Sequence, residues 1–247
     1  MLRCVRLMKL SVIVPTLNEE RTLPKALASI PFGAEVIVAD GQSADRTREV
    51  AAQLDARVVI GEPGRGAQMN LGAKRASGET LLFLHADCVL DTDADKAIEE
   101  ALSDGRVVGG SFRLRIRPAG LGLAVVSLGS NLRARFLMLP YGDQALFVRR
   151  AIFEEVGGYR EIPIMEDVDL VRRLRKRGQL RHLDASVTTT PRHWEGLGPV
   201  LTTLLNWVAV AAFTLGAPPS RLASFYHRLH RSPRSATEQQ PLSASSE

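Results

Sequence analysis

Carboxylates stand at two places in the sequence where they could act on a substrate. Asp87 follows an apolar run at residues 81–84 and lies two positions after His85. Glu166 and Asp167 are adjacent at the predicted start of a helix. A carboxylate can ligate a divalent cation, and a second carboxylate can take a proton from a hydroxyl group. The two places together predict a site that combines a bound cation with general-base chemistry.

The elements that would position these residues alternate between strand and helix. Four apolar or β-branched runs within residues 10–87 predict strands, and the segments between them have helical patterns. Such alternation is typical of a mostly parallel sheet in an α/β fold, and ligands bind beyond the carboxyl ends of its strands. Asp40 and Asp87 both follow predicted strands. We therefore expect both to border one cleft.

Composition narrows the class of protein. The chain has 247 residues and a net charge of +5, a mild excess that suits phosphate-bearing ligands or an anionic membrane. Its two cysteines, Cys4 and Cys88, cannot form a disulfide framework, which favours a reducing, cytoplasmic setting. The chain has no Walker loop, zinc-ligand array or nucleophile elbow. Its basic stretch lacks the interleaved aromatic residues of nucleic-acid binders, so we expect no nucleic-acid partner.

Two motifs carry a resemblance to a known family. Residues 11–20, Ser-Val-Ile-Val-Pro-Thr-Leu-Asn-Glu-Glu, and residues 40–47, Asp-Gly-Gln-Ser-Ala-Asp-Arg-Thr, resemble the N-terminal half of family 2 glycosyltransferases. These are inverting enzymes with the GT-A fold that use nucleotide-diphosphate sugars. The resemblance extends through Asp169. Later motifs, among them Arg-Gly-Ala-Gln-Met-Asn and His-Ala-Asp, are similar to a small bacterial branch, some of whose members are linked with arsenosugar biosynthesis.

The resemblance implies a nucleotide-sugar site at the strand ends. Simpler roles stay open: Asp40 and Asp143 could belong to plain turns, Arg65 could be a solvated loop charge, and Arg192 could lie in a surface loop. The residues that the resemblance assigns to the nucleotide sugar are Pro15, Asn18, Glu19, Asp40, Arg65, Asn70, Ala86, Asp143 and Arg192.

The resemblance also implies a metal site for Mg²⁺ or Mn²⁺. His85-Ala86-Asp87 occupies the place of the family's Asp-x-Asp motif, so Asp87 would ligate the metal. His85 departs from that pattern. It could ligate the metal, which suits Mn²⁺ better than Mg²⁺, or it could be a hydrogen-bonded strand-end histidine. The late residue His193 would contact the metal or the diphosphate, or else lie in a surface loop.

The acids at the start of the later helix are the catalytic candidates. An inverting transfer needs one carboxylate to take the proton of the acceptor hydroxyl as that hydroxyl attacks. Glu166-Asp167 resembles the family's Glu-Asp motif, in which the aspartate is the usual base. We therefore predict Asp167 as the base and Glu166 as a supporting residue. The alternative is that these acids only complement the helix dipole.

We expect three parts: a three-layer GT-A domain with a mostly parallel central sheet at residues 1–195, a helical appendage at 196–231, and a disordered tail at 232–247. The apolar run that begins at Pro199 contains Thr202 and Asn206, which favours a buried or interfacial helix over a spanning one. A basic, acid-free C-terminal stretch suggests peripheral contact with an anionic membrane. The alternative is a soluble protein with a basic helix.

The predicted function is inverting transfer of a sugar from a nucleotide-diphosphate sugar to an acceptor hydroxyl. The expected partners are therefore the donor and the acceptor. Two alternatives remain. One is a polyprenyl-phosphate sugar synthase at the membrane surface. The other is a nucleotide-sugar-binding module without activity, because the metal motif is incomplete.

Overall fold

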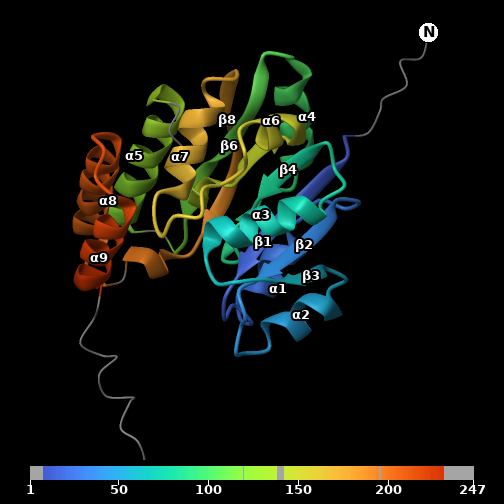
Figure 1. Cartoon of the computed structure of the whole chain (residues 1–247), viewed down its shortest axis with the longest axis horizontal. Coiled ribbons are helices and arrows are strands. Elements are labelled where there is room, and N and C mark those ends of the chain that lie inside the picture. The colour runs from blue at the N-terminus through green and yellow to red at the C-terminus, as the bar shows by residue number, and fades with distance from the viewer. Residues whose placement is uncertain (1–7, 119, 138–141, 195, 231–247) are drawn as a thin grey trace, which may run out of the picture.

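A computed structural model describes residues 8–118, 120–137, 142–194 and 196–230. In this part of the chain, one sheet of eight strands lies between helices, with the strand order β3-β2-β1-β4-β7-β6-β8-β5 (Figure 1). The strands are β1 (Leu10–Thr16), β2 (Glu35–Asp40), β3 (Arg57–Ile60), β4 (Thr80–Phe83), β5 (Cys88–Leu90), β6 (Val107–Ile116), β7 (Leu146–Arg149) and β8 (Gln179–Thr189).

The helices cover both faces of this sheet and one end of it. They are α1 (Leu23–Ala28), α2 (Thr47–Gln53), α3 (Arg65–Arg75), α4 (Ala94–Ser103), α5 (Leu121–Leu137), α6 (Arg150–Glu155), α7 (Glu166–Leu174), α8 (Pro199–Thr214) and α9 (Pro219–His230). Two short 3₁₀ helices, η1 (Gly142–Gln144) and η2 (Pro191–Trp194), precede β7 and follow β8.

The first half of the chain builds the predicted parallel sheet. Strand β1 pairs in parallel with β2 and with β4, and Thr16 lies opposite Asp40 at the carboxyl end. Strand β7 then runs antiparallel to both β4 and β6, while β6 pairs in parallel with β8. The sheet is therefore mixed but mostly parallel, as expected. Strand β5, which pairs antiparallel with β8, is too short to have been predicted.

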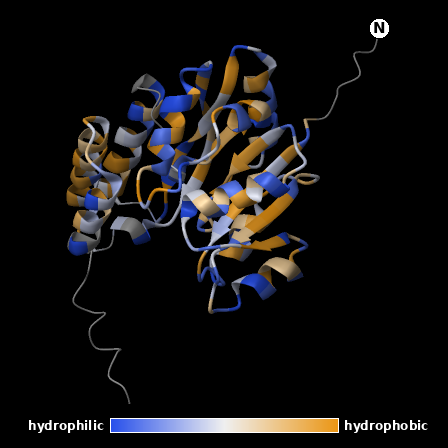
Figure 2. Ribbon diagram, in the orientation of Figure 1, coloured by the Kyte–Doolittle hydropathy of each residue, from blue (hydrophilic) through white to orange (hydrophobic). Residues whose placement is uncertain are grey.

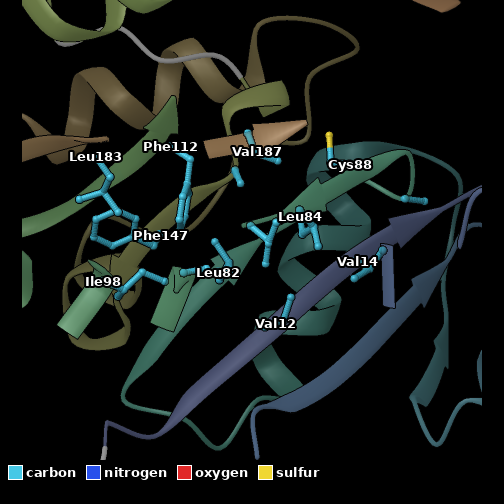
Figure 3. Close-up of a cluster of buried hydrophobic side chains, with 14 of the residues drawn as sticks. Val12, Val14, Leu82, Leu84, Cys88, Ile98, Phe112, Phe147, Leu183 and Val187 are labelled. Carbon is cyan, nitrogen blue, oxygen red and sulfur yellow. The ribbon is translucent and has the colours of Figure 1, made fainter. Parts of the chain in front are cut away.

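Side chains of the central strands feed two hydrophobic cores, one on each face. On one face, Val12 and Val14 of β1 pack with Leu82 and Leu84 (Figure 3). On the other face, Ile13 packs in a second cluster beneath α3, α6 and α7. Burial on both faces explains why these strands have continuous apolar sequences. The predicted three layers are confirmed.

The first loop differs from the sequence prediction. The segment between the first two strands has a helical pattern, but α1 begins only at Leu23. Asn18 has a left-handed backbone, with φ of 57°, and its N–H donates to the Ser43 hydroxyl at 2.9 Å. The chain after β1 is thus tied to the loop after β2 before it can start a helix. This pairing of loops brings the ends of β1 and β2 together.

Helices α5, α8 and α9 stack at one end of the molecule (Figure 1). Ala209 of α8 packs against Met165 and Val168 near the start of α7. None of the helices in the described part of the chain is both long enough and apolar enough to cross a bilayer. The tail at 232–247 lies outside the described residues, and the predicted domain boundaries stay predictions.

Candidate active site

A cleft of about 710 Å³ opens at the carboxyl ends of β1 and β4. Its near wall comes from the loops after these strands and from the start of α3. Its far wall comes from α5, η1, the loop before α7 with the first turn of that helix, α8 and α9. The cleft therefore joins residues from both halves of the chain. The predicted site residues that line it are Pro15, Glu19, Arg65, His85, Ala86, Asp87, Asp143, Asp167 and Arg192.

Asp167 lies in the first turn of α7 and faces the cleft. The Gly142 N–H donates to its Oδ2 at 2.7 Å, and the Val168 N–H donates to its Oδ1 at 2.7 Å. Met165, just before the helix, has a left-handed backbone with φ of 68°, a conformation that its buried packing must enforce. The carboxylate of Asp167 is thus fixed in orientation from two sides.

Glu166 sits beside Asp167 but does not line the cleft. It is only 3% exposed, and its Oε1 forms an ion pair with Nε of Arg65 at 2.8 Å. Burial raises the pKa of Glu166, and the charge of Arg65 opposes that rise. Arg65 in turn reaches the cleft from the first turn of α3. Glu166 therefore holds Arg65 in place, and its supporting role in catalysis stays a prediction.

Asp143, in η1, brings a third carboxyl group to the cleft. The pKa of Asp143 is raised to about 6, chiefly by burial; the charge of Arg133 lowers it, and the charges of Asp167 and Asp87 contribute to the rise. One oxygen of Asp143 is buried without a hydrogen-bond partner in the described part of the chain. Asp143 therefore changes its charge more easily than an ordinary aspartate near neutral pH.

His85 and Asp87 follow β4, as the sequence predicts, and both line the cleft. Burial, and then the charge of Arg65, lowers the pKa of His85 to about 4, so its imidazole is neutral at physiological pH. The Thr190 hydroxyl donates to Oδ2 of Asp87 at 3.1 Å. Arg192 lies 3.6 Å from the same oxygen and pairs with Glu19 at 3.0 Å. A positive group thus stands beside the carboxylate.

The sequence resemblance implies a bound divalent cation, which would need oxygen or nitrogen ligands from side chains of the cleft. No group of three or more His, Cys, Asp or Glu side chains in the described part of the chain is arranged to hold a metal ion. Asp87 offers a hard carboxylate oxygen, and His85 offers a neutral nitrogen. These donors fit a cation whose remaining ligands are phosphate oxygens and water. The side chain of His193, the third predicted ligand, lies outside the described residues.

Three predicted ligand residues do not line the cleft. Asp40 is fully buried and accepts hydrogen bonds from the Thr16 hydroxyl at 3.0 Å and from the N–H and hydroxyl of Ser43 at 2.9 and 2.5 Å. Asn18 accepts from the Ala44 N–H at 2.8 Å. Asn70 both donates to and accepts from the backbone of residue 159, each at 2.8 Å. In this structure all three hold loops together.

Some residues that line the cleft were not assigned a role from the sequence. Gln68 lines the cleft, and its Nε2 donates to the carbonyls of Thr16 and Ala39 at 2.7 and 2.8 Å. Trp207 of α8 and Tyr226 of α9 form part of the far wall. The pattern around Gln68 pointed to the nucleotide, but no local pattern marks Trp207 or Tyr226, because only the packing of α8 and α9 brings them to the cleft.

Part of the chain is similar in sequence to known proteins. Residues 11–125, just under half of the chain, match Glycosyl transferase family 2. An uncharacterised glycosyltransferase of Mycobacterium tuberculosis is 36% identical over 105 residues, which cover 42% of this chain and 48% of that protein. A dolichol-phosphate mannosyltransferase of Pyrococcus furiosus is 30% identical over 109 residues, covering 40% of this chain and 31% of that one. The chain thus spans half or less of the length of these relatives.

The fold is also shared with a solved structure. Glucosyl-3-phosphoglycerate synthase from Mycobacterium tuberculosis, in complex with Mn²⁺, UDP-glucose and phosphoglyceric acid, superimposes with a TM-score of 0.62 at 20% identity. The match covers 85% of this chain and 81% of that one. At this identity the likeness shows the fold alone. The chain therefore has the GT-A fold and carries, over residues 11–125, a region that matches Glycosyl transferase family 2.

Proposed function

We propose that this protein is an inverting glycosyltransferase that moves a sugar from a nucleotide-diphosphate sugar to an acceptor hydroxyl. The observation that carries the proposal is the convergence of Asp167, Asp87 and Arg65 in one cleft. A direct displacement needs a base on the acceptor side and positive charge near the leaving diphosphate. The family match and the fold support the same reaction class.

Asp167 is the proposed base. Its carboxylate faces the cleft, and two backbone N–H groups fix its orientation, so one oxygen edge can be aimed at an acceptor hydroxyl. The acceptor oxygen attacks the anomeric carbon, its proton passes to Asp167, and the bond to the diphosphate breaks with its electron pair. A single displacement of this kind inverts the anomeric configuration. Glu166 assists by holding Arg65.

The leaving diphosphate would lie near the ends of β1 and β4. Arg65 and Arg192 supply fixed positive charge there, each tethered by a carboxylate, Glu166 or Glu19. Pro15 and Ala86 offer backbone surface for the nucleotide. We propose that Asp87, with His85, binds Mg²⁺ or Mn²⁺ together with the diphosphate. When bound, the cation neutralises charge on the leaving group.

The test is a donor screen with purified protein. UDP-, GDP- and TDP-sugars are offered with and without Mn²⁺, and release of the nucleoside diphosphate is measured in the presence of simple alcohols. Proton NMR of the glycoside then gives its anomeric configuration. We expect one donor class to react, with inversion. A retained configuration overturns the inverting mechanism. Nucleotide binding without any product favours the non-catalytic binding module instead.

A polyprenyl-phosphate acceptor is the second candidate, favoured by Trp207 on the cleft wall. Its indole lines the cleft and is also 52% exposed, so an apolar chain could lie against it at the opening. The relative from Pyrococcus furiosus is named for a lipid phosphate acceptor. Transfer of labelled sugar to polyprenyl phosphate, but not to soluble alcohols, would establish this reading. The link with arsenosugar biosynthesis that the sequence resemblance implies stays a prediction.

A further inference from the structure

Exposed apolar side chains gather on the helices at one end of the molecule. Of the fifteen large apolar residues that are exposed in the described part of the chain, eleven lie on or next to α5, α8 and α9. Their spacing of three or four residues places them in one stripe on each long helix. The stripe residues are Leu121, Val125, Leu128 and Leu132 on α5, and Val200, Leu201, Leu204, Trp207 and Val208 on α8.

The two stripes belong to neighbouring helices. A Cβ added to Gly122, in the first turn of α5, would lie 2.7 Å from Cγ of Pro199 at the start of α8. The Tyr226 hydroxyl of α9 donates to Oδ1 of Asn206 on α8 at 2.7 Å. Figure 2 shows the hydrophobic colour along α8, at the edge of the molecule farthest from β3. The three helices thus form one unit, which we call the helical end.

Basic residues lie on α9, the third helix of the helical end, and acids are missing from all three helices. No Asp or Glu occurs in residues 105–142 or 196–230. A shallow groove of about 380 Å³ on α9 is lined by Arg221 and Arg228 together with Ser220, Ser224 and Phe225. The two arginines are seven positions apart, so they lie on the same helix face. Guanidinium and hydroxyl groups around a groove are suited to a phosphate group.

We propose that the helical end docks the protein on the surface of an anionic lipid bilayer. The apolar stripes of α5 and α8 would enter the boundary between headgroups and acyl chains, and the α9 groove would bind lipid phosphates. Trp207, half-exposed beside Leu204 and Val208, has the amphipathic ring that is enriched at membrane interfaces. Docking lies outside the transfer reaction and does not depend on it.

Charge distinguishes a bilayer from a second copy of the chain. In a twofold dimer the same patch would face itself. Because neither α8 nor α9 contains an acid, such a contact would give Arg221 and Arg228 no carboxylate partner from these helices. An anionic lipid surface provides counter-charge for both arginines while it buries the apolar stripes. A bilayer therefore complements both features of the helical end.

The test is flotation of the full chain with vesicles. Vesicles of phosphatidylcholine alone are compared with vesicles that contain about one third phosphatidylglycerol, at low and at high salt. We expect the protein to float with the anionic vesicles at low salt, to float less at high salt, and to stay unbound with phosphatidylcholine alone. Failure to float with anionic vesicles at low salt overturns the proposal. The assay needs no turnover, so its outcome is independent of the proposed transfer activity.

Two variant pairs connect the binding to these residues. Arg221→Gln with Arg228→Gln should lower partitioning about fivefold for each arginine, and Leu204→Glu with Val208→Glu should abolish flotation. The matched controls are Lys25→Gln with Lys74→Gln, and Leu54→Glu with Ile60→Glu, at exposed positions away from the helical end. The circular dichroism spectrum and the Tm of each variant should match those of the parent. Controls that lose as much binding as the test pairs would contradict the proposal.

A protein interface is the competing outcome. If the chain does not float but is dimeric by light scattering, and Leu204→Glu with Val208→Glu makes it monomeric, the apolar surface serves a second copy and the membrane proposal is wrong. If the parent floats, and if the parent and the variant with Leu204→Glu and Val208→Glu have the same oligomeric state, the proposal stands.

Discussion

The two walls of the cleft differ in how their polar side chains are used. Behind the near wall, Asp40, Asn18 and Asn70 direct hydrogen bonds at neighbouring loops and do not line the cleft. On the far wall, Asp143 and Asp167 face open space. Both walls were predicted from carboxylates or amides near the ends of elements. The difference shows that such a residue can either build the site or act in it, and that only its contacts distinguish the two.

Asp167→Asn should have the largest effect, because it removes the proposed base without changing the shape of the side chain. The amide oxygen can still accept from one of the two N–H groups. We expect kcat to fall about 10²- to 10⁴-fold, the usual contribution of general-base catalysis, while the Kd for the nucleoside diphosphate stays unchanged. Steady-state kinetics and calorimetry measure these two quantities.

The control for that change is Asp55→Asn. Asp55 is exposed, lies outside the cleft, and has a left-handed backbone with φ of 56° that asparagine tolerates well. It should retain parental kinetics. Turnover that survives in Asp167→Asn would mean that another group on the far wall, with Asp143 the nearest candidate, takes the proton.

Asp40→Ala should act on stability instead of on chemistry. It leaves the hydroxyls of Thr16 and Ser43 and the Ser43 N–H buried without their acceptor. We expect a loss of about 3 kcal/mol in the free energy of unfolding, since each unsatisfied buried group costs roughly 1–3 kcal/mol. Denaturant unfolding measures it, and Asp40→Asn should lose less. An unchanged stability with lost nucleotide binding would place Asp40 in contact with the donor, as the sequence resemblance implies.

The fold was more predictable than the site, and particular residues show why. Val12, Ile13 and Val14 are continuous and apolar because β1 is buried on both faces, so local sequence was enough to place that strand. The expected cleft position of Asp87 followed directly from the end of β4. Asp40 ends its strand in the same way, but its partners Thr16 and Ser43 depend on how two loops pair, which no local pattern reveals.

The far wall was partly predictable. The sequence resemblance predicted Asp167 as the base and Glu166 as a supporting residue, but it did not reveal that Glu166 pairs with Arg65, about a hundred positions away in the chain. The placement of Trp207 depends on where α8 packs. Long-range contacts of this kind are set by tertiary structure, so local periodicity carries no signal for them.

Asn70→Ala should lower the stability of the near wall by less than Asp40→Ala does. The change removes both hydrogen bonds between α3 and the backbone of residue 159. We expect a loss of about 2 kcal/mol of stability, at roughly 1 kcal/mol for each hydrogen bond, with little change in kcat. Gln53→Ala, at an exposed amide on α2, is the matched control and should leave the unfolding free energy nearly unchanged. A raised KM for the donor at parental stability would instead make Asn70 a ligand residue.

The smallest effect concerns Asp143 and depends on pH. Its pKa is raised from 3.8 to about 6 in the folded protein, chiefly by burial. Between those values the folded state holds more protons than the unfolded state, so this group lowers stability as pH rises from about 4 to about 6. Other carboxylates, such as Asp104 with its pKa lowered to about 2, change stability in the opposite direction at lower pH.

The informative quantity is therefore the difference in Tm between Asp143→Asn and the parent. This difference should grow across the window by several degrees, because each unit of the raised pKa adds to the free-energy difference between parent and variant. A constant difference would mean that the folded protein does not raise the pKa of Asp143, which would remove the contrast between the two walls.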